Sequence, residues 1–198
     1  ASGIDFNEDT DMSRFSMRTL MGTPSMKVIA DHGVQEEPYT HRRYQSINTE
    51  ILGQIIKNAT GRSLAEYMEE KLWKRIGAEQ DAYWTLSNGT ELAMGGLSVS
   101  LRDYARFARL YLNGGSFHGE QILTKEWVRD SMDVSAAYSR PGANQDVYNA
   151  IGYGYQWWVP EGDRGEFMAI GVYGQWMYAD PSRQIIIVKT SADPDFMS

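Results

Sequence analysis

The spacing of apolar residues changes from a helical to a strand pattern near residue 150 of this 198-residue chain. Before that point, apolar side chains recur as on the buried face of an amphipathic helix. After it, β-branched and aromatic runs alternate with turn residues, and we expect strands over 153–159, 167–172, 175–179 and 185–190. Helices followed by a strand meander predict an α+β fold with an antiparallel sheet. We therefore expect one domain over 1–198, helical and looped over 1–150 and stranded over 151–198.

Two helices follow one another in the first half of the chain. Apolar residues at helical spacing run from Ile47 to Ala59, and Gly61 follows as a stop signal. Ser63 and Glu66 have the spacing of a capping box, which predicts that the next helix begins there.

The remaining elements are predicted from caps and turn residues. Ser100 and Thr124 are expected to begin two further helices. Residues 180–183, with proline at the second position, fit a type I turn that joins the last two strands as a hairpin. Residues 1–43 and 133–150 are expected to be mostly irregular.

Composition excludes several classes of function. The net charge is −7 with no basic cluster, which argues against nucleic acid and anionic membrane surfaces as partners. The chain has no cysteine, so disulfides, thiolate catalysis and cysteine-based zinc sites are excluded. The acidic run 5–11 lacks the glycine and glutamate of a calcium-binding loop, because Thr10 and Ser16 stand there, and we expect a solvated acidic loop. Neither a metal nor a cofactor is predicted, and no apolar run is long enough for a membrane span.

Tyr44 and Ser46 stand two positions apart at the entrance of the first predicted helix. Exposed there, they would deliver a phenol and a hydroxyl into a pocket, which suits proton transfer and substrate orientation. In the alternative, Tyr44 packs against the protein and Ser46 caps the helix. The local pattern leaves both readings open.

A set of short motifs occurs in order along nearly the whole chain. The motifs are Tyr44-Gln45-Ser46-Ile47-Asn48-Thr49-Glu50, Gly95-Gly96-Leu97-Ser98, Gln156-Trp157-Trp158 and Ile170-Gly171-Val172-Tyr173-Gly174-Gln175. This ordered set resembles the serine β-lactamase-like superfamily of bacterial hydrolases, in its class C, esterase and penicillin-binding branch. Within that branch it is most similar to nylon-oligomer (6-aminohexanoate-dimer) hydrolases and related carboxylesterases. The resemblance implies a β-lactamase/DD-peptidase-like fold.

The resemblance also implies catalytic roles at matching positions. Tyr44 matches a tyrosine that shuttles a proton between nucleophile and leaving group beside a lysine. Ser46 stands where many relatives have asparagine, and it would help to orient the substrate or the lysine. Val172 matches the position whose backbone N–H supplies half of an oxyanion hole, a donor worth about 3 kcal/mol in acyl transfer.

Substrate contacts are implied on the last part of the chain. Tyr173, Gly174 and Gln175 replace the Lys/His-Thr-Gly motif with which true β-lactamases recognise a carboxylate, so we expect weak β-lactamase activity at best. Trp157 or Trp158 would line the acyl pocket; alternatively, the pair belongs to the core.

One residue pair argues against nylon-oligomer activity. A tyrosine and an aspartate assist amide cleavage in the nylon-oligomer hydrolases, and an ungapped alignment places Thr10 and Met21 at their positions. This favours a carboxylesterase-like parent.

The nucleophile that the family requires is missing from the chain. Ser-Lys hydrolases use Ser-x-x-Lys at a helix start, and no serine here has a lysine three residues later. In relatives this motif lies upstream of an element that residues 2–5 resemble. We therefore expect the chain to be the middle and C-terminal part of a longer hydrolase, without the Ser-x-x-Lys segment and a terminal helix that packs on the sheet, and inactive alone.

Two functions follow from the resemblance. In the first, the parent protein cleaves ester or amide bonds of small acyl substrates through an acyl-enzyme, and this chain supplies the tyrosine acid/base and an oxyanion amide. In the second, the protein is a non-catalytic, penicillin-binding-like module that binds ligands without turnover. The compartment stays open, with export slightly favoured because bacterial relatives are often exported.

Overall fold

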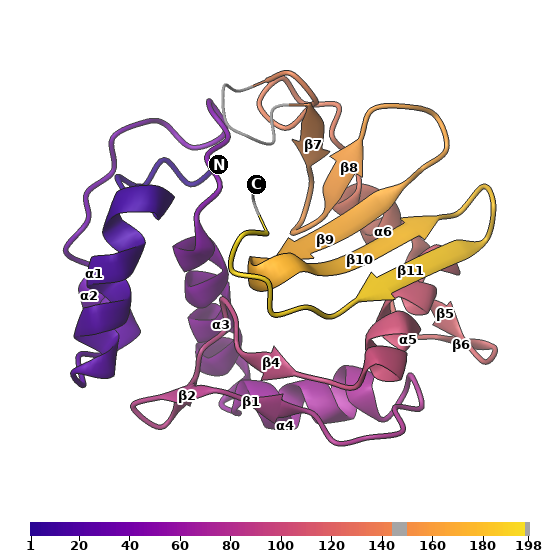
Figure 1. Ribbon diagram of the computed structural model, residues 1–198, viewed down its shortest axis with the longest axis horizontal. Coiled ribbons are helices and arrows are strands. Elements are labelled where there is room, and N and C mark those ends of the chain that lie inside the picture. The colour runs from indigo at the N-terminus through magenta and orange to yellow at the C-terminus, as the bar shows by residue number, and fades with distance from the viewer. Residues whose placement is uncertain (144–149, 197–198) are drawn as a thin grey trace. The chain divides into compact units, whose positions relative to one another are not determined.

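The computed structural model describes residues 1–143 and 150–196 (Figure 1). Residues 144–149, part of the segment expected to be irregular, lie outside the described residues. Contacts divide the chain into two compact units, the first formed by Ala1–Lys71 with Ala82–Ser98 and the second by Leu72–Asp81 with Val99–Ser198. Among the described helices, none has the length and apolar character needed to cross a membrane.

The first unit contains four α-helices and two short β-ribbons. Its helices are α1 (Glu8–Leu20), α2 (Ser25–Ile29), α3 (Ser46–Thr60) and α4 (Leu64–Met68). Its strands are β1 (Tyr83–Trp84), β2 (Leu86–Ser87), β3 (Thr90–Glu91) and β4 (Leu97–Ser98), which pair antiparallel as β1 with β4 and β2 with β3.

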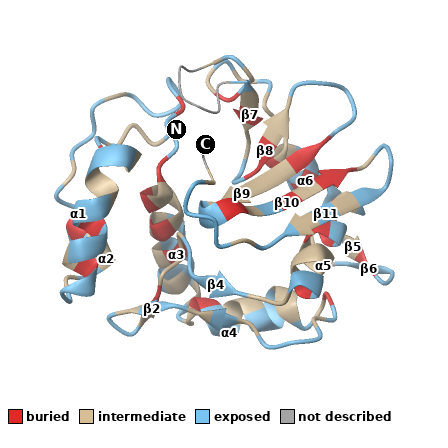
Figure 2. Cartoon of the chain, in the orientation of Figure 1, coloured by how far each residue is buried: buried red, intermediate tan, exposed pale blue. Residues whose placement is uncertain are grey.

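Helix α3 lies at the centre of the first unit's core. Its predicted boundaries are confirmed: Gly61 adopts a left-handed conformation (φ 67°) after the last turn, and its N–H donates to the Lys57 carbonyl at 2.8 Å. Buried residues occur on α1, α2 and α3 (Figure 2). The core consists of residues from these helices and from the segment before α1, namely Phe6, Phe15, Val28, Ile29 and Ile47. Burial of this apolar surface holds the three helices together.

Residues 1–43 are irregular over most of their length, as expected, but they also contain the helices α1 and α2, which were not predicted. The acidic run is not a solvated loop but the start of α1. Asn7 is the N-cap, and its side-chain oxygen accepts from the N–H groups of Asp9 (2.9 Å) and Thr10 (3.1 Å). Carboxylates in the first turn, including Glu8, interact favourably with the positive end of the helix dipole.

Glu50 connects three parts of the first unit from within α3. Its side chain is buried and accepts hydrogen bonds from the Ser25 hydroxyl at 2.6 Å and the Ala93 N–H at 2.8 Å. One turn later, Gly53 lies against the same loop, and a β-carbon there would be 2.3 Å from the Ala93 Cβ. The missing side chain at residue 53 is therefore what allows α3 and this loop to approach.

The second predicted helix is confirmed at its start and modified at its end. Both hydrogen bonds of the Ser63–Glu66 capping box are present. The α-helical part ends at Met68, and the chain continues as a π-helix over Glu69–Trp73.

The second unit is built on a five-stranded sheet. Its strands are β7 (Ile151–Tyr153), β8 (Trp158–Pro160), β9 (Phe167–Gly171), β10 (Gln175–Asp180) and β11 (Ile185–Lys189). Their order is β11-β10-β9-β8-β7 with antiparallel pairing throughout, which confirms the predicted meander.

Two details of the sheet bear on the predicted strands. The turn at 180–183 is confirmed, with the Arg183 N–H donating to the Asp180 carbonyl at 3.3 Å. The single strand expected over 153–159 is wrong, because β7 ends and β8 begins within it. Gln156 has a positive φ of 67°, and the chain turns there so that the Gly154 N–H reaches the Trp157 carbonyl at 2.9 Å.

Helix α5 (Leu101–Leu112) packs against β10 and β11, and α6 (Lys125–Ser131) follows the short hairpin of β5 (Ser116–Phe117) and β6 (Glu120–Gln121). Both predicted caps are confirmed, since the Ser100 hydroxyl accepts from the Asp103 N–H and the Thr124 hydroxyl from the Trp127 N–H. The core between α5, α6 and the sheet is formed by buried side chains, namely Ala108, Tyr111, Val128, Trp157, Phe167, Met177 and Ala179.

Asp103 is a fully buried carboxylate in the first turn of α5. It accepts from the N–H groups of Glu79 (2.9 Å) and Gln80 (3.1 Å), and it contacts Ser100 and Arg106. Burial raises the pKa of this carboxyl, but the hydrogen bonds outweigh burial and hold the pKa below its usual range. Asp103 therefore fastens residues 79–80 to α5.

Replacing Gly53 by alanine tests the close approach of α3 to its neighbouring loop. In an ordinary helix interior, Gly→Ala gains about 1 kcal/mol. Here the new methyl would lie 2.3 Å from the Ala93 Cβ and 3.1 Å from the Leu64 Cδ1, so we expect a loss of about 1–3 kcal/mol in urea unfolding. The double variant G53A/A93G removes the first clash and should recover stability. A G53A protein as stable as wild type would contradict this packing.

The low pKa of Asp103 predicts a pH dependence of stability. Its stabilising effect is complete above the unfolded-state pKa of about 3.9 and is lost as the pH falls through the lower folded-state pKa. We expect D103N to remove this dependence and to lower the free energy of unfolding at neutral pH by about 2 kcal/mol. Urea unfolding between acid and neutral pH measures both effects. The exposed Asp163 provides a D163N control, which should behave as wild type.

Candidate functional site

The turn before α3 presents Tyr44 and Ser46 on one side of the chain. Gln45 between them has extended backbone (φ −147°, ψ 109°), where successive side chains point to opposite sides. Gln45 is buried, so its neighbours face away from that burial, and Tyr44 is 36% exposed. The structure therefore brings together these two predicted site residues. Ser46 does not cap the helix, because the N-cap is Gln45 and Ser46 is the first helical residue.

The side chain of Gln45 holds the turn in place. Its Nε2 donates to the carbonyl oxygens of Ile4 (2.9 Å) and Phe6 (2.6 Å). Its Oε1 accepts from the Ser2 hydroxyl at 3.1 Å. Both ends of the amide are therefore bound to the segment that precedes α1, and the backbone on either side of Gln45 has a fixed position.

Glu8 makes a second connection to the same turn from the start of α1. Its Oε2 accepts from the Ser46 N–H at 2.9 Å, and its Oε1 accepts from the Ser46 hydroxyl. A carboxylate at the N-terminus of α3 satisfies a backbone N–H that has no partner within the helix. It also lies at the positive end of the helix dipole, where a negative charge is stabilising.

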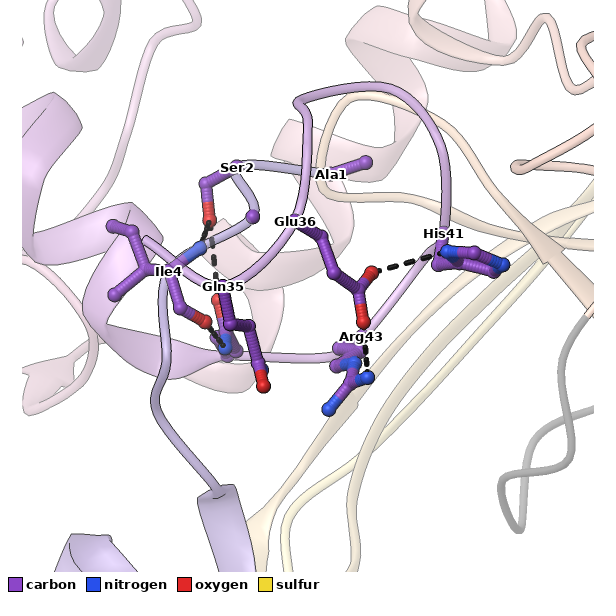
Figure 3. A pocket seen from close by; sticks show the side chains of 9 residues that line it. Ala1, Ser2, Ile4, Gln35, Glu36, His41 and Arg43 are labelled. Carbon is purple, nitrogen blue, oxygen red and sulfur yellow. Dashed lines mark hydrogen bonds and ion pairs between the residues drawn. The ribbon is translucent and has the colours of Figure 1, made fainter. Parts of the chain in front are cut away.

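A small pocket lies beside this turn (Figure 3). Its wall includes the Glu36 carboxylate, which pairs with Arg43 and lies 3.1 Å from the Nδ1 of His41. Gly3 also lines it, and a β-carbon at Gly3 would lie 2.1 Å from the Glu36 carbonyl oxygen. The charged side chains of this wall are engaged with one another. In the described part of the chain, no group of three His, Cys, Asp or Glu residues could hold a metal ion.

The other predicted site residues belong to the second unit. Val172, Tyr173 and Gly174 form the tight turn between β9 and β10. Tyr173 has a positive φ of 61° and Gly174 one of 79°, and these consecutive left-handed residues reverse the chain. A tyrosine in that conformation costs about 1–2 kcal/mol, and strain of this kind clusters at functional sites. Val172 and Tyr173 are both exposed at this turn.

Gln175 connects the end of this turn to the C-terminal segment. Its Nε2 donates to the Ser191 carbonyl, and its Oε1 accepts from the Ser191 N–H at 3.4 Å. The Asp193 N–H donates to the Tyr173 carbonyl at 3.2 Å. The side chain expected to contact substrate is therefore bound to backbone in this structure.

The two tryptophans are both buried. Trp157 lies in the core, with its ring 4.8 Å from that of Tyr111 and 4.9 Å from that of Phe167. Trp158 packs on Tyr153 at a centroid distance of 4.5 Å. The sequence left open whether the tryptophans line the acyl pocket or belong to the core. Trp157 belongs to the core, and contact with substrate stays a prediction for both residues.

A charged cluster supports the sheet beside these residues. Glu166 accepts from the Tyr178 hydroxyl and pairs with Arg164 at 2.6 Å. The bond to this carboxylate raises the pKa of the Tyr178 phenol, which favours its neutral form. Tyr178 therefore acts as a hydrogen-bond donor that connects β10 to the residue just before β9.

Glu8 and Gln45 were not identified from the sequence. Gln45 was read only as the spacer between Tyr44 and Ser46, and Glu8 only as part of an acidic run. Their partners lie about forty positions away along the chain. The one available signal was the Asn7 cap, which would have placed Glu8 at a helix start.

Comparison with known proteins places the chain among related folds. The sequence model of the family described as Beta-lactamase matches residues 1–196. A 6-aminohexanoate-dimer hydrolase from Paenarthrobacter ureafaciens is 34% identical over 158 residues, which cover 77% of this chain and 40% of that protein. A solved structure of a candidate 6-aminohexanoate-dimer hydrolase from Bacillus anthracis matches with a TM-score of 0.76 and 35% identity, over 85% of this chain and 43% of the other.

A more distant structure shares the fold. A penicillin-binding protein from Bacillus halodurans matches with a TM-score of 0.71 at 14% identity, over 97% of this chain and 66% of that one. The chain spans less than half the length of either hydrolase relative.

The contact between Gln175 and Ser191 can be tested by a substitution that replaces the side-chain amide nitrogen with oxygen. In Q175E the carboxylate still accepts from the Ser191 N–H but cannot donate to the Ser191 carbonyl, and the two oxygens repel. We expect faster hydrogen exchange over residues 190–196, measured by mass spectrometry. Gln184 donates to the Pro181 carbonyl at 2.9 Å, so Q184E is a matched control that should leave this segment unchanged. Equal exchange in Q175E and wild type would contradict the contact.

Proposed function

Because the chain belongs to the β-lactamase family, as its motifs indicated, we propose that it is part of a serine hydrolase. The proposed reaction is cleavage of ester or amide bonds in small acyl substrates through an acyl-enzyme. The observation that carries the proposal is the turn that presents Tyr44 and Ser46 on one side at the start of α3. The hydrolase relatives and the penicillin-binding fold support this reaction class.

The proposal requires a nucleophile from outside these 198 residues. No Ser-x-x-Lys occurs in the chain, and the hydrolase relatives are more than twice as long as the part that matches. We propose that the segment before residue 1 carries this motif in the full-length protein. The chain alone would then bind substrate poorly and would not turn it over.

The proposed steps give each predicted residue a task. The serine hydroxyl of the missing segment attacks the acyl carbon and loses its proton, and Tyr44 conveys that proton to the leaving alcohol or amine. The N–H of Val172 stabilises the negative oxygen that forms in this step. Water then attacks the acyl-enzyme, releases the acid and restores the serine.

Substrate recognition is assigned to the turn between β9 and β10. Tyr173, Gly174 and Gln175 offer no cationic side chain where true β-lactamases have lysine or histidine, which supports substrates without a carboxylate at that point. Tyr173 is exposed and available for contact. The buried Trp157 and Trp158 would act by shaping the wall of the acyl pocket from beneath.

Within this class the proposal favours a carboxylesterase over a nylon-oligomer hydrolase. Thr10 lies on the exposed side of α1 and Met21 is 78% exposed at its end. Neither side chain has the hydroxyl-aromatic or carboxylate chemistry that assists amide cleavage at the matching positions of the nylon-oligomer enzymes. Esters, whose leaving group needs less assistance, are therefore the proposed substrates.

Covalent labelling of the full-length protein tests the proposal. A fluorophosphonate probe should add to one serine of the full-length protein and to none of these 198 residues expressed alone, as measured by intact mass. Labelling of the isolated chain would overturn the assignment of an external nucleophile. No adduct on either protein would favour a ligand-binding module without turnover.

Replacing Tyr44 by phenylalanine tests the proton transfer. We expect Y44F in the full-length protein to lower kcat for ester hydrolysis by about 100-fold or more, because general acid–base catalysis typically contributes that much. Tyr39 lies on the same unit and is 71% exposed, so Y39F is a matched control that should retain wild-type kcat. Equal kcat in Y44F and Y39F would remove Tyr44 from the mechanism.

A further inference from the structure

The contact between Glu8 and Ser46 fixes the direction of a hydrogen bond at the candidate site. An ionised carboxylate has no proton and can only accept hydrogen bonds. The Ser46 N–H and the Ser46 hydroxyl both point to the Glu8 carboxylate, one to each oxygen. The hydroxyl proton of Ser46 is therefore committed to Glu8.

A serine hydroxyl has one proton and two lone pairs. With the proton directed to Glu8, the Ser46 Oγ has only lone pairs to offer on its remaining sides. It can accept a hydrogen bond from an N–H or ammonium group but cannot donate one to a carbonyl or an anion. The nearby negative charge of Glu8 further favours a cationic or N–H partner.

The position of Ser46 makes this direction relevant to the site. Ser46 and Tyr44 lie on the same side of the chain, because the buried Gln45 between them has extended backbone. Gln45 is held by the Ile4 and Phe6 carbonyls, so the turn cannot easily rotate to exchange partners. Ser46 is half-buried, which limits competition from water.

We propose that Glu8 is a positioning residue that makes Ser46 a hydrogen-bond acceptor for an N–H or ammonium group beside Tyr44. The inference rests on the proposed function of this turn. It adds Glu8 to the site and specifies that Ser46 accepts a hydrogen bond there. The N–H group has two possible sources, an amide of the substrate or an ammonium group of the protein. In both cases Glu8 acts through the Ser46 hydroxyl and does not touch substrate.

The same unit offers a control. In the capping box of α4, Glu66 accepts from the Ser63 N–H at 3.1 Å and from the Ser63 hydroxyl at 2.9 Å. This is again one carboxylate that binds both donors of a serine at a helix start. Both donors bind the Oε2 of Glu66, whereas Glu8 uses one oxygen for each donor. E66Q therefore controls for the loss of a carboxylate charge at a helix start, in a helix that has no part in the proposed site.

The experiment uses the full-length protein with the variants E8Q, S46A, E8Q/S46A and E66Q. A glutamine at position 8 can still accept from the Ser46 N–H, but its Nε2 donates to the Ser46 Oγ and so reverses the bond. We expect kcat to fall by about 10-fold or more in E8Q, with KM and thermal midpoint no more altered than in E66Q. In the S46A background, E8Q should have no further effect on kcat.

Two substrates with the same acyl group, an ester and an anilide, distinguish the source of the N–H group. If the substrate amide donates, S46A lowers kcat for the anilide alone. If a protein ammonium group donates, S46A lowers kcat for both substrates equally. Either result supports an accepting Ser46.

Three results would overturn the inference. They are an E8Q kcat equal to that of E66Q, additive effects of E8Q and S46A, and an S46A variant with wild-type kcat on both substrates. If E8Q does not fold, the comparison of S46A with S46T tests the inference. Threonine keeps the hydroxyl and should retain the activity that alanine loses. A wild-type protein that takes no fluorophosphonate and hydrolyses no ester would instead overturn the proposed function itself.

Discussion

The amide of Gln45 binds the segment before α1, which is also paired through its backbone with residues 33–39. Two carbonyl oxygens, those of Ile4 and Phe6, receive its two protons, and the Ser2 hydroxyl binds its oxygen. Buried polar groups cost free energy unless they are hydrogen-bonded, so this side chain and the backbone bonds to residues 33–39 together make burial of the segment possible. The apolar core beneath it, with Phe6 and Ile47, depends on that burial.

Similar polar connections occur in both units. Glu50 binds a hydroxyl of α2 and an N–H of the loop at Ala93 within the first unit. Asp103 binds two N–H groups of residues 79–80 within the second. Each joins a helix to a loop. At each of these two carboxylates, removal of one member of a hydrogen bond would leave the other member buried without a partner, which costs free energy.

Elements whose ends depend on sequence neighbours could be predicted. Helix α5 begins after Ser100 because that side chain binds an N–H three residues later. Helix α1 could not be predicted from the sequence, because only two of its side chains are buried and its apolar residues show only a weak helical pattern. The run over 153–159 carries strand-forming residues, but the N–H of Tyr155 within it donates to the distant Ser131 carbonyl at 2.8 Å, a contact that the local pattern does not reveal. Likewise Tyr44 and Ser46 followed from local spacing, whereas the partner Glu8 is 38 positions away.

The two units are interleaved along the chain. The path leaves the first unit after residue 71, returns at 82 and leaves again after 98. During synthesis, therefore, the first unit stays incomplete until the strand that ends at Ser98 has emerged, although its helices come much earlier. The early segment 72–81 must wait longer still, since Asp103 and the helix that carries it are made afterwards. A cut after Ser98 would therefore keep the first unit whole but would separate residues 72–81 from the rest of the second unit.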